Sequence, residues 1–151
     1  VGFMRIFALI ILAAAWAGCN SFQPQSGHNI VKVLPHYLDT SGNHSDGPTL
    51  LHRDVYQDKL RKNPDLVRAV RYDVNWRGTG EVKVRIELRS TKAGVETMIV
   101  ERVETASGRR SHWTAILIDD ATYKTFGQPE SWRVSLWQGE TQVGEQKSFL
   151  W

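Results

Sequence analysis

Three histidines recur at intervals of eight residues along one polar stretch of the chain: His36, His44 and His52. Asp39, Asp46 and Asp54 lie nearby in the sequence. Imidazole nitrogens and carboxylate oxygens bind Zn²⁺ and related ions, so this stretch is a candidate metal site. Turn-rich loops also collect His and Asp, because both tolerate unusual backbone angles and are well solvated. We favour a solvated loop over residues 40–48 and expect no metal or other cofactor.

The single cysteine of the chain, Cys19, directly follows an apolar stretch near the N-terminus. Residues 6–16 are all apolar, Arg5 is the one charge before them, and small residues follow, as in a secretory signal. The run is too short for a membrane-spanning helix, which needs about 20 apolar residues. Residues 15–17 form an A-x-A motif, so cleavage after Ala17 is the alternative to processing before Cys19.

The segment Ala17-Gly18-Cys19 resembles the bacterial lipobox, in which small residues precede a cysteine that is lipidated before cleavage. Trp16 stands where that motif usually has Leu. The resemblance implies a lipoprotein-type signal peptide over residues 1–18 and attachment to a membrane through lipid on Cys19. Two or three acyl chains anchor firmly, because each buried CH₂ contributes about 0.8 kcal/mol. In the bacterial lipoproteins that this segment resembles, an Asp directly after the cysteine retains the protein at the inner membrane. The resemblance therefore implies that Asn20 favours sorting to an outer membrane.

The charge balance is only mildly basic, with 19 Lys and Arg against 16 Asp and Glu. These charges are scattered, whereas a nucleic-acid-binding face clusters its basic residues, so we expect no nucleic-acid partner. One cysteine permits no disulfide within the chain, and an exported domain of this kind relies on its apolar core. Residues 19–29 are polar and contain Pro24 and Gly27. We expect them to tether a domain that spans residues 30–151.

Apolar and polar residues alternate with a period of two along much of that domain. The pattern is cleanest over 82–88 and is also clear over 69–76, with a Gly-rich turn between the two segments. The same reasoning predicts further strands over 30–34, 95–103, 111–118, 131–137 and 141–151. Pro35 ends the first of these strands or places it at the edge of a sheet.

Two short helical connections interrupt the strands. Residues 49–64 repeat apolar side chains at helical spacing and end at Asn63-Pro64. In the second connection, Asp120 is expected to cap the N-terminus of a short helix that Gly127 closes. Seven strands joined mostly by short turns predict an all-β, immunoglobulin-like antiparallel sandwich. Its core is expected to bury Trp76, Trp113 and Trp132, with Phe149 and Trp151 pinning the last strand.

Catalytic signatures are missing from the sequence. There is no G-x-S-x-G motif and no phosphate-binding glycine loop. The adjacent carboxylates Asp119 and Asp120 lie at a strand end, where neighbouring side chains point apart, so they do not form a glycosidase pair. We therefore expect a protein without enzymatic activity. An enzyme with an unrecognised or metal-dependent site is the third hypothesis, after the two binding roles given below.

One aromatic residue suggests a binding surface instead. Trp137 falls on the strand face opposite Trp132, together with Arg133. An exposed Trp can stack on a sugar ring or receive an apolar side chain of a partner, so Trp137 and Arg133 are candidate ligand-binding residues, together with segment 36–54. We favour the alternatives, in which both faces of the sheet carry aromatic residues or the 49–64 helix covers Trp137.

Three longer segments are similar to a group of small bacterial lipoproteins of unassigned activity: "KVLPHYLDTSGNHS", "RDVYQDKLRKNP" and "WRVSLWQGETQVGEQKSFLW". The similarity implies an exported, membrane-anchored protein that faces the periplasm, and it supplies no catalytic residues. We expect a non-catalytic interaction or structural module with an envelope protein as partner. A module that binds a small ligand or glycan is the alternative.

Overall fold

Seven strands, two α-helices and one 3₁₀ turn make up residues 27–108 and 110–151, the part of the chain that this computed structural model describes. The number of strands and the two helical connections are as predicted. Cys19, the expected signal peptide and most of the expected tether lie outside the described residues. In chain order the elements are β1 (Asn29–Asp39), α1 (Leu50–Lys62), η1 (Pro64–Leu66), β2 (Val67–Arg77), β3 (Gly80–Ser90), β4 (Met98–Ala106), β5 (Ser111–Ile118), α2 (Asp120–Phe126), β6 (Pro129–Gln138) and β7 (Thr141–Lys147).

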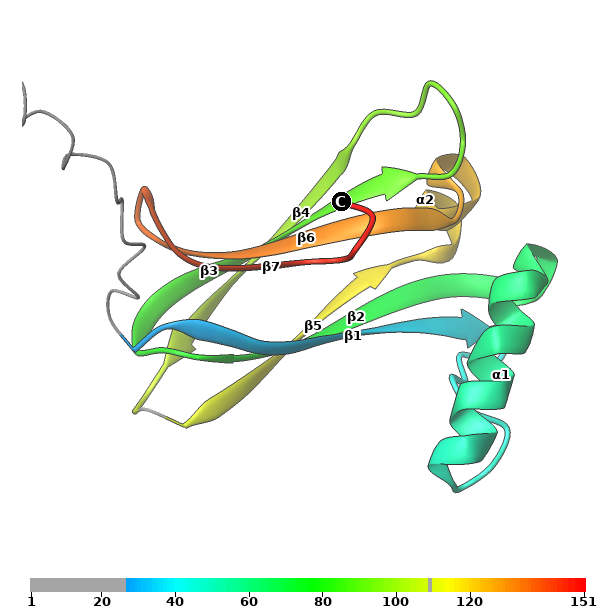
Figure 1. The fold of residues 1–151 in the computed structure, drawn as a ribbon, viewed down its shortest axis with the longest axis horizontal. Coiled ribbons are helices and arrows are strands. Elements are labelled where there is room, and N and C mark those ends of the chain that lie inside the picture. The colour runs from blue at the N-terminus through cyan, green and yellow to red at the C-terminus, as the bar shows by residue number, and fades with distance from the viewer. Residues whose placement is uncertain (1–26, 109) are drawn as a thin grey trace, which may run out of the picture.

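The strands form two antiparallel sheets that pack face to face. One has three strands in the order β1-β2-β5, and the other has four in the order β4-β3-β6-β7. Figure 1 shows the two layers, with β1 and β7 side by side along one flank. Only Gly78 and Thr79 separate β2 from β3, yet these strands belong to different sheets. The all-β sandwich is therefore confirmed, and this short connection crosses between its layers.

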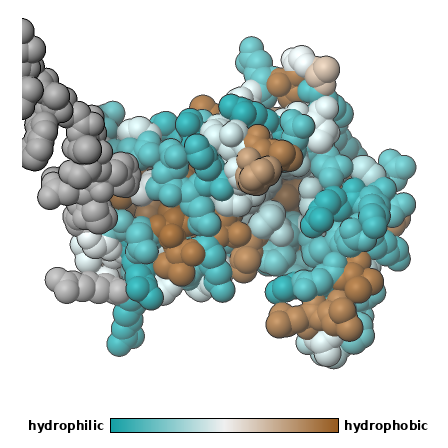
Figure 2. All heavy atoms as spheres, viewed as in Figure 1, coloured by the Kyte–Doolittle hydropathy of each residue, from teal (hydrophilic) through white to brown (hydrophobic). Residues whose placement is uncertain are grey.

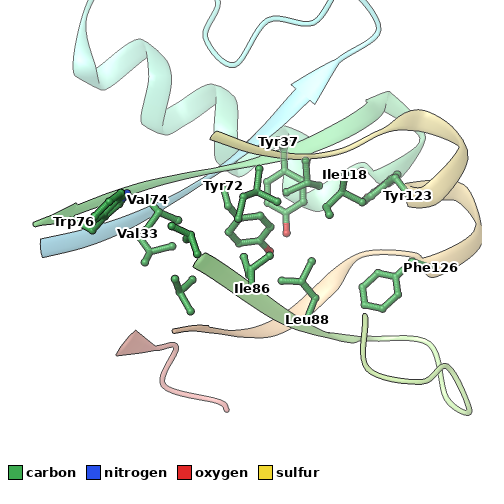
Figure 3. Close-up of a cluster of buried hydrophobic side chains, with 14 of the residues drawn as sticks. Val33, Tyr37, Tyr72, Val74, Trp76, Ile86, Leu88, Ile118, Tyr123 and Phe126 are labelled. Carbon is green, nitrogen blue, oxygen red and sulfur yellow. The ribbon is translucent and has the colours of Figure 1, made fainter. Parts of the chain in front are cut away.

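The period-two pattern decides which residues fill the space between the sheets. The apolar positions of β3 are completely buried, while the charged residues between them face outward. A one-residue slip of this strand would put those charges into the core, which fixes its register. Figure 3 shows the core side chains of both sheets pointing toward one another. The largest fully buried ones include Trp76, Tyr72, Ile86, Leu88, Ile116 and Leu136.

Pro35 lies inside β1 and does not end it. β1 is an edge strand of its sheet, and Pro is tolerated there because it need not donate to a ladder on the open side. It pairs with Tyr72, and the register is irregular near both ends of the strand. The prediction that Pro35 places this strand at the edge of a sheet is confirmed, and the strand continues to Asp39.

Trp113 departs from the predicted core. β5 pairs Thr114 with Val74 and His112 with Trp76, which turns Thr114 inward and leaves Trp113 outward with 53% of its surface exposed. Both faces of β5 carry apolar residues, so alternation alone does not reveal which face is inward. Trp76 is buried as predicted, and Trp132 packs against the core while partly exposed.

The C-terminal prediction is wrong as well. β7 ends at Lys147, and Phe149 is fully exposed. Trp151 packs on the outer face of the four-stranded sheet, where the Arg89 and Arg133 guanidinium groups lie 4.1 and 5.0 Å from its ring centroid. Cation–π contacts of this kind stabilise an aromatic ring at the surface, outside the core.

Two element boundaries also differ from the sequence pattern. β4 covers Met98–Ala106, where residues 95–103 were expected. Asp119, and not Asp120, caps α2: its carboxylate accepts the Thr122 N–H at 2.9 Å. Gly127 has φ 88°, a backbone region that favours glycine, and it ends this helix as predicted.

Candidate interaction site

α1 stands at one end of the sandwich, with its C-terminal half fixed to the sheets. Its Gln57 side chain accepts the Tyr37 N–H at 2.7 Å and donates to the Tyr37 carbonyl at 2.8 Å. The same amide donates to the His44 carbonyl at 2.8 Å. Leu60 is almost completely buried in the core cluster. These contacts hold the helix to the open edge of β1 and to the following loop.

The loop over residues 40–48 supports the other half of the helix. At its start, the Asp39 carboxylate accepts the Ser41 and Asn43 N–H groups at 2.8 Å and the Tyr56 hydroxyl at 2.7 Å. The hydrogen bond to Asp39 raises the pKa of Tyr56 to about 12. Burial acts to raise the pKa of Asp39, but its hydrogen bonds lower it overall. The loop and helix are thus held in one arrangement.

The N-terminal half of α1 carries large apolar side chains that face solvent. Leu50, Leu51 and Val55 are 69, 72 and 61% exposed. Figure 2 shows an apolar area at the end of α1 that Figure 1 places away from the sheets. We call these three residues the α1 apolar patch. The sequence predicted the helix but not the direction of its apolar side chains. Leu51 and Val55 face solvent because other side chains of α1 pack against β1.

The patch lies far from the start of the domain. β1 has 11 residues, which corresponds to about 35 Å of extended strand. Figure 1 shows β1 entering at one end of the sandwich, with α1 at the other end. At the entry end, the His28 ring nitrogen lies within hydrogen-bonding distance of the Thr79 backbone. His28 therefore lies at the end of the sandwich opposite the α1 apolar patch.

The three histidines of the sequence pattern have separate environments. His36 is buried on the outer face of the three-stranded sheet, with its ring centroid 5.0 Å from that of His44. Its Nε2 lies 3.5 Å from the Asp73 carboxylate, and its Nδ1 is buried without a hydrogen-bond partner. His52 lies 2.6 Å from the Thr49 hydroxyl through Nδ1. Across residues 27–108 and 110–151, no three His, Cys, Asp or Glu side chains are grouped so as to hold a metal ion.

Charges and burial set the protonation of His36. Burial lowers the pKa of its imidazole from 6.5, and the nearby cations Arg71 and Arg53 act in the same direction. The Asp73 carboxylate opposes them. Asp73 is itself paired with Arg71 at 2.9 Å, and burial outweighs its effect on the pKa of His36. The arrangement favours a neutral histidine packed beneath α1 and its loop.

Trp137 lies on the outer face of the four-stranded sheet and has partners within the chain. The Arg85 guanidinium lies 4.8 Å from its ring centroid, and its ring N–H donates to the Ser135 hydroxyl at 2.9 Å. Arg133 pairs with Glu87 at 2.6 Å. α1 packs on β1 in the other sheet, so the expectation that this helix covers Trp137 is wrong. Trp137 and segment 36–54 consequently do not form one ligand site.

Two hollows of about 460 and 440 Å³ lie near the α2 end of the sandwich. The first is lined by Lys92, whose ammonium group donates to the carbonyls of Lys124 and Thr125. The second is lined by Asp39 and Asp119, whose carboxylates already accept backbone N–H groups. No Ser, Cys or His lines either hollow. Lys92, Asp39 and Asp119 are thus engaged by backbone groups of the fold, whereas the buried Tyr123 hydroxyl of the first hollow has no hydrogen-bond partner.

Comparison of the chain with known protein families, curated proteins and solved structures gives no match. In the part of the chain that the structure describes, no helix is both long enough and apolar enough to span a membrane. The α1 apolar patch consists of exposed aliphatic side chains on a helix whose other face is hydrogen-bonded and buried.

Proposed function

We propose that the chain is an exported bacterial lipoprotein whose sandwich is a non-catalytic module that binds another protein of the cell envelope. Lipid on Cys19 would anchor it on the periplasmic side, with the outer membrane favoured. The lipobox-like residues and the apolar run before them support this address. The α1 apolar patch supports the binding role.

An immunoglobulin-like arrangement is part of this proposal. Two antiparallel sheets of three and four strands suit such a sandwich, with the first, second and fifth strands together in one sheet. The fourth strand joins the third, which differs from the constant-type arrangement of immunoglobulin domains. Modules of this architecture present helices and loops at the two ends of a rigid sandwich.

The observation that carries the binding role is the exposure of the α1 apolar patch. Burying a side chain such as Leu or Val contributes about 1.5–3 kcal/mol, so three of them left in solvent forgo considerable stabilisation. Contiguous exposed apolar areas typically mark interaction sites. With lipid at the N-terminus, the patch would lie at the end of the sandwich away from the anchor, where a periplasmic partner can reach it.

Address and binding require separate experiments. Membrane fractionation and mass measurement of the N-terminus should find acylated Cys19 in the native protein, and Cys19→Ala should release the protein from the membrane. A soluble, unmodified N-terminus in the native protein would contradict the anchor.

For binding, Leu51→Glu with Val55→Glu should abolish in-cell crosslinking to an envelope protein through a photoreactive residue at position 54. The matched control is Ile99→Glu, which changes an aliphatic side chain of comparable exposure on β4. Point substitutions suit this test because a deletion of 36–54 would remove Tyr37 and Leu38 from the core. Equal crosslinking in both variants would contradict the role of the patch.

A further inference from the structure

The four edge strands of the two sheets differ sharply in composition. Edges usually carry charges, Pro or bulges, because an exposed regular edge pairs with other strands. β1 contains Pro35 and irregular register, and β4 and β7 carry several charged residues. β5 reads SHWTAILI, without Asp, Glu, Lys, Arg, Pro or Gly, and pairs with β2 along its whole length without a shift in register. Among the described residues, no strand is hydrogen-bonded to its other side.

The outward face of β5 is also apolar. Trp113 and Leu117 are 53 and 48% exposed, and the small side chain of Ala115 lies exposed between them. Thr114, by contrast, points inward and accepts the Trp76 ring N–H. This edge therefore combines free backbone groups with apolar side chains on the solvent side. It is separate from the α1 apolar patch, which belongs to another element.

We infer that β5 pairs with β5 of a second copy of this chain, antiparallel, across a twofold axis at Ala115. Opposed residues of antiparallel strands share one face, so a register centred on Ala115 places Trp113 opposite Leu117 of the second copy, twice. Aromatic and aliphatic cross-strand pairs of this kind are favourable. The absence of charge on β5 removes like-charge repulsion between the identical strands.

Charges just beyond β5 complement one another in the same register. Arg110 precedes the strand, and Asp119 and Asp120 follow it. Antiparallel pairing about Ala115 brings the basic start of one strand beside the acidic end of the other, at both ends of the interface. A self-pairing edge with opposite charges at its two ends favours a second copy over an unrelated extended peptide, which would have no such match.

Disulfide trapping in the full chain tests the register. Ala115→Cys should form a disulfide-linked dimer under mild oxidation, because this residue faces itself across the axis. Trp113→Cys alone should not, since the two copies would lie about 14 Å apart along the strands, but mixed with Leu117→Cys it should form the dimer. The control is Ile99→Cys, on the charged edge strand β4. Trapping at Ile99→Cys but not at Ala115→Cys overturns the proposal.

Sedimentation of the purified full chain supplies the second measurement. The parent protein should be a dimer and Ala115→Lys a monomer, because two ammonium groups would meet at the axis. Ile99→Lys should remain a dimer, and circular dichroism should show that both variants are folded. A parent protein that is monomeric at all soluble concentrations, or a dimer that survives Ala115→Lys, overturns the proposal.

Discussion

Gln57 of α1 and Tyr37 of β1 exchange two hydrogen bonds, at 2.7 and 2.8 Å, in the manner of two paired strand residues. Toward Tyr37, the primary amide of Gln57 presents one acceptor and one donor, the same groups as a peptide unit, and its nitrogen also donates to His44. It thereby satisfies the backbone of an edge strand with a side chain. Because Gln57 is also bonded to His44, one residue joins the helix, the loop and the sheet.

Gln57→Ala should lower the free energy of unfolding by about 3 kcal/mol. Three hydrogen bonds contribute about 1 kcal/mol each, and their loss leaves the buried Tyr37 groups without partners. Urea denaturation measures the change. The control is Asp54→Ala on the exposed side of the same helix. Similar losses in the two variants would show that Gln57 does not fix α1.

The stability of the protein should fall as the pH drops below about 6.5 because of His36. Its folded-state pKa is below 6.5, so the unfolded chain binds the proton more readily in this range. Stability is therefore full above pH 6.5 and is lost as pH falls toward the folded-state pKa. Protonation would place a cation near Arg53, Arg71 and His44, opposed only by Asp73.

Urea denaturation at several pH values measures this loss, which His36→Gln should remove. The variant keeps a polar side chain of similar reach but does not titrate. An unchanged pH dependence in His36→Gln would assign the loss to other groups.

Thr114→Val should destabilise the core by about 1–2 kcal/mol, although the two side chains have nearly the same shape. Thr114 accepts the Trp76 ring N–H at 2.9 Å in a buried setting, and Val would leave that donor without a partner. Thermal and urea denaturation measure the effect. Thr105→Val, on the exposed part of β4, is the control and should be nearly neutral. A neutral Thr114→Val would show that this hydrogen bond contributes nothing net.

The two adjacent aspartates before α2 should differ on substitution. Asp119→Ala removes the acceptor of the Thr122 N–H, whereas Asp120→Ala removes only an exposed ion pair with Lys124. Melting temperatures should therefore fall further in Asp119→Ala. The reverse order would mean that Asp120 supports the helix start more than its neighbour does.

Local sequence patterns determined most of the elements. Alternation along 82–88 shows one buried and one solvated face, because a charged residue cannot enter the core without a large cost. The start and end of α1 follow from Thr49 as its cap and from Pro64, which cannot continue a helix. The uncharged composition of β5 is also evident in the sequence. It points to an interaction surface only because β5 lies at the edge of a sheet.

Strand pairing was decided by the tertiary structure. β3 follows β2 after two residues, yet its hydrogen-bonded neighbours are β4 and β6. The sequence does not predict this, because a short turn between two layers has the same local composition as the turn of a hairpin. The face of Trp113 likewise depended on its register with β2, since both faces of β5 are apolar.

What the sequence by itself determined is thus the local part of the protein: the two-residue and helical periods, the turns and the approximate ends of the two helices. The tertiary structure alone decided which sheet each strand joined, that Gln57 faces β1 while Leu51 and Val55 face solvent, and that β5 is an open edge. The physical reason is range. Periods and caps depend on neighbours within a few residues, whereas pairing and exposure depend on residues far apart in the chain.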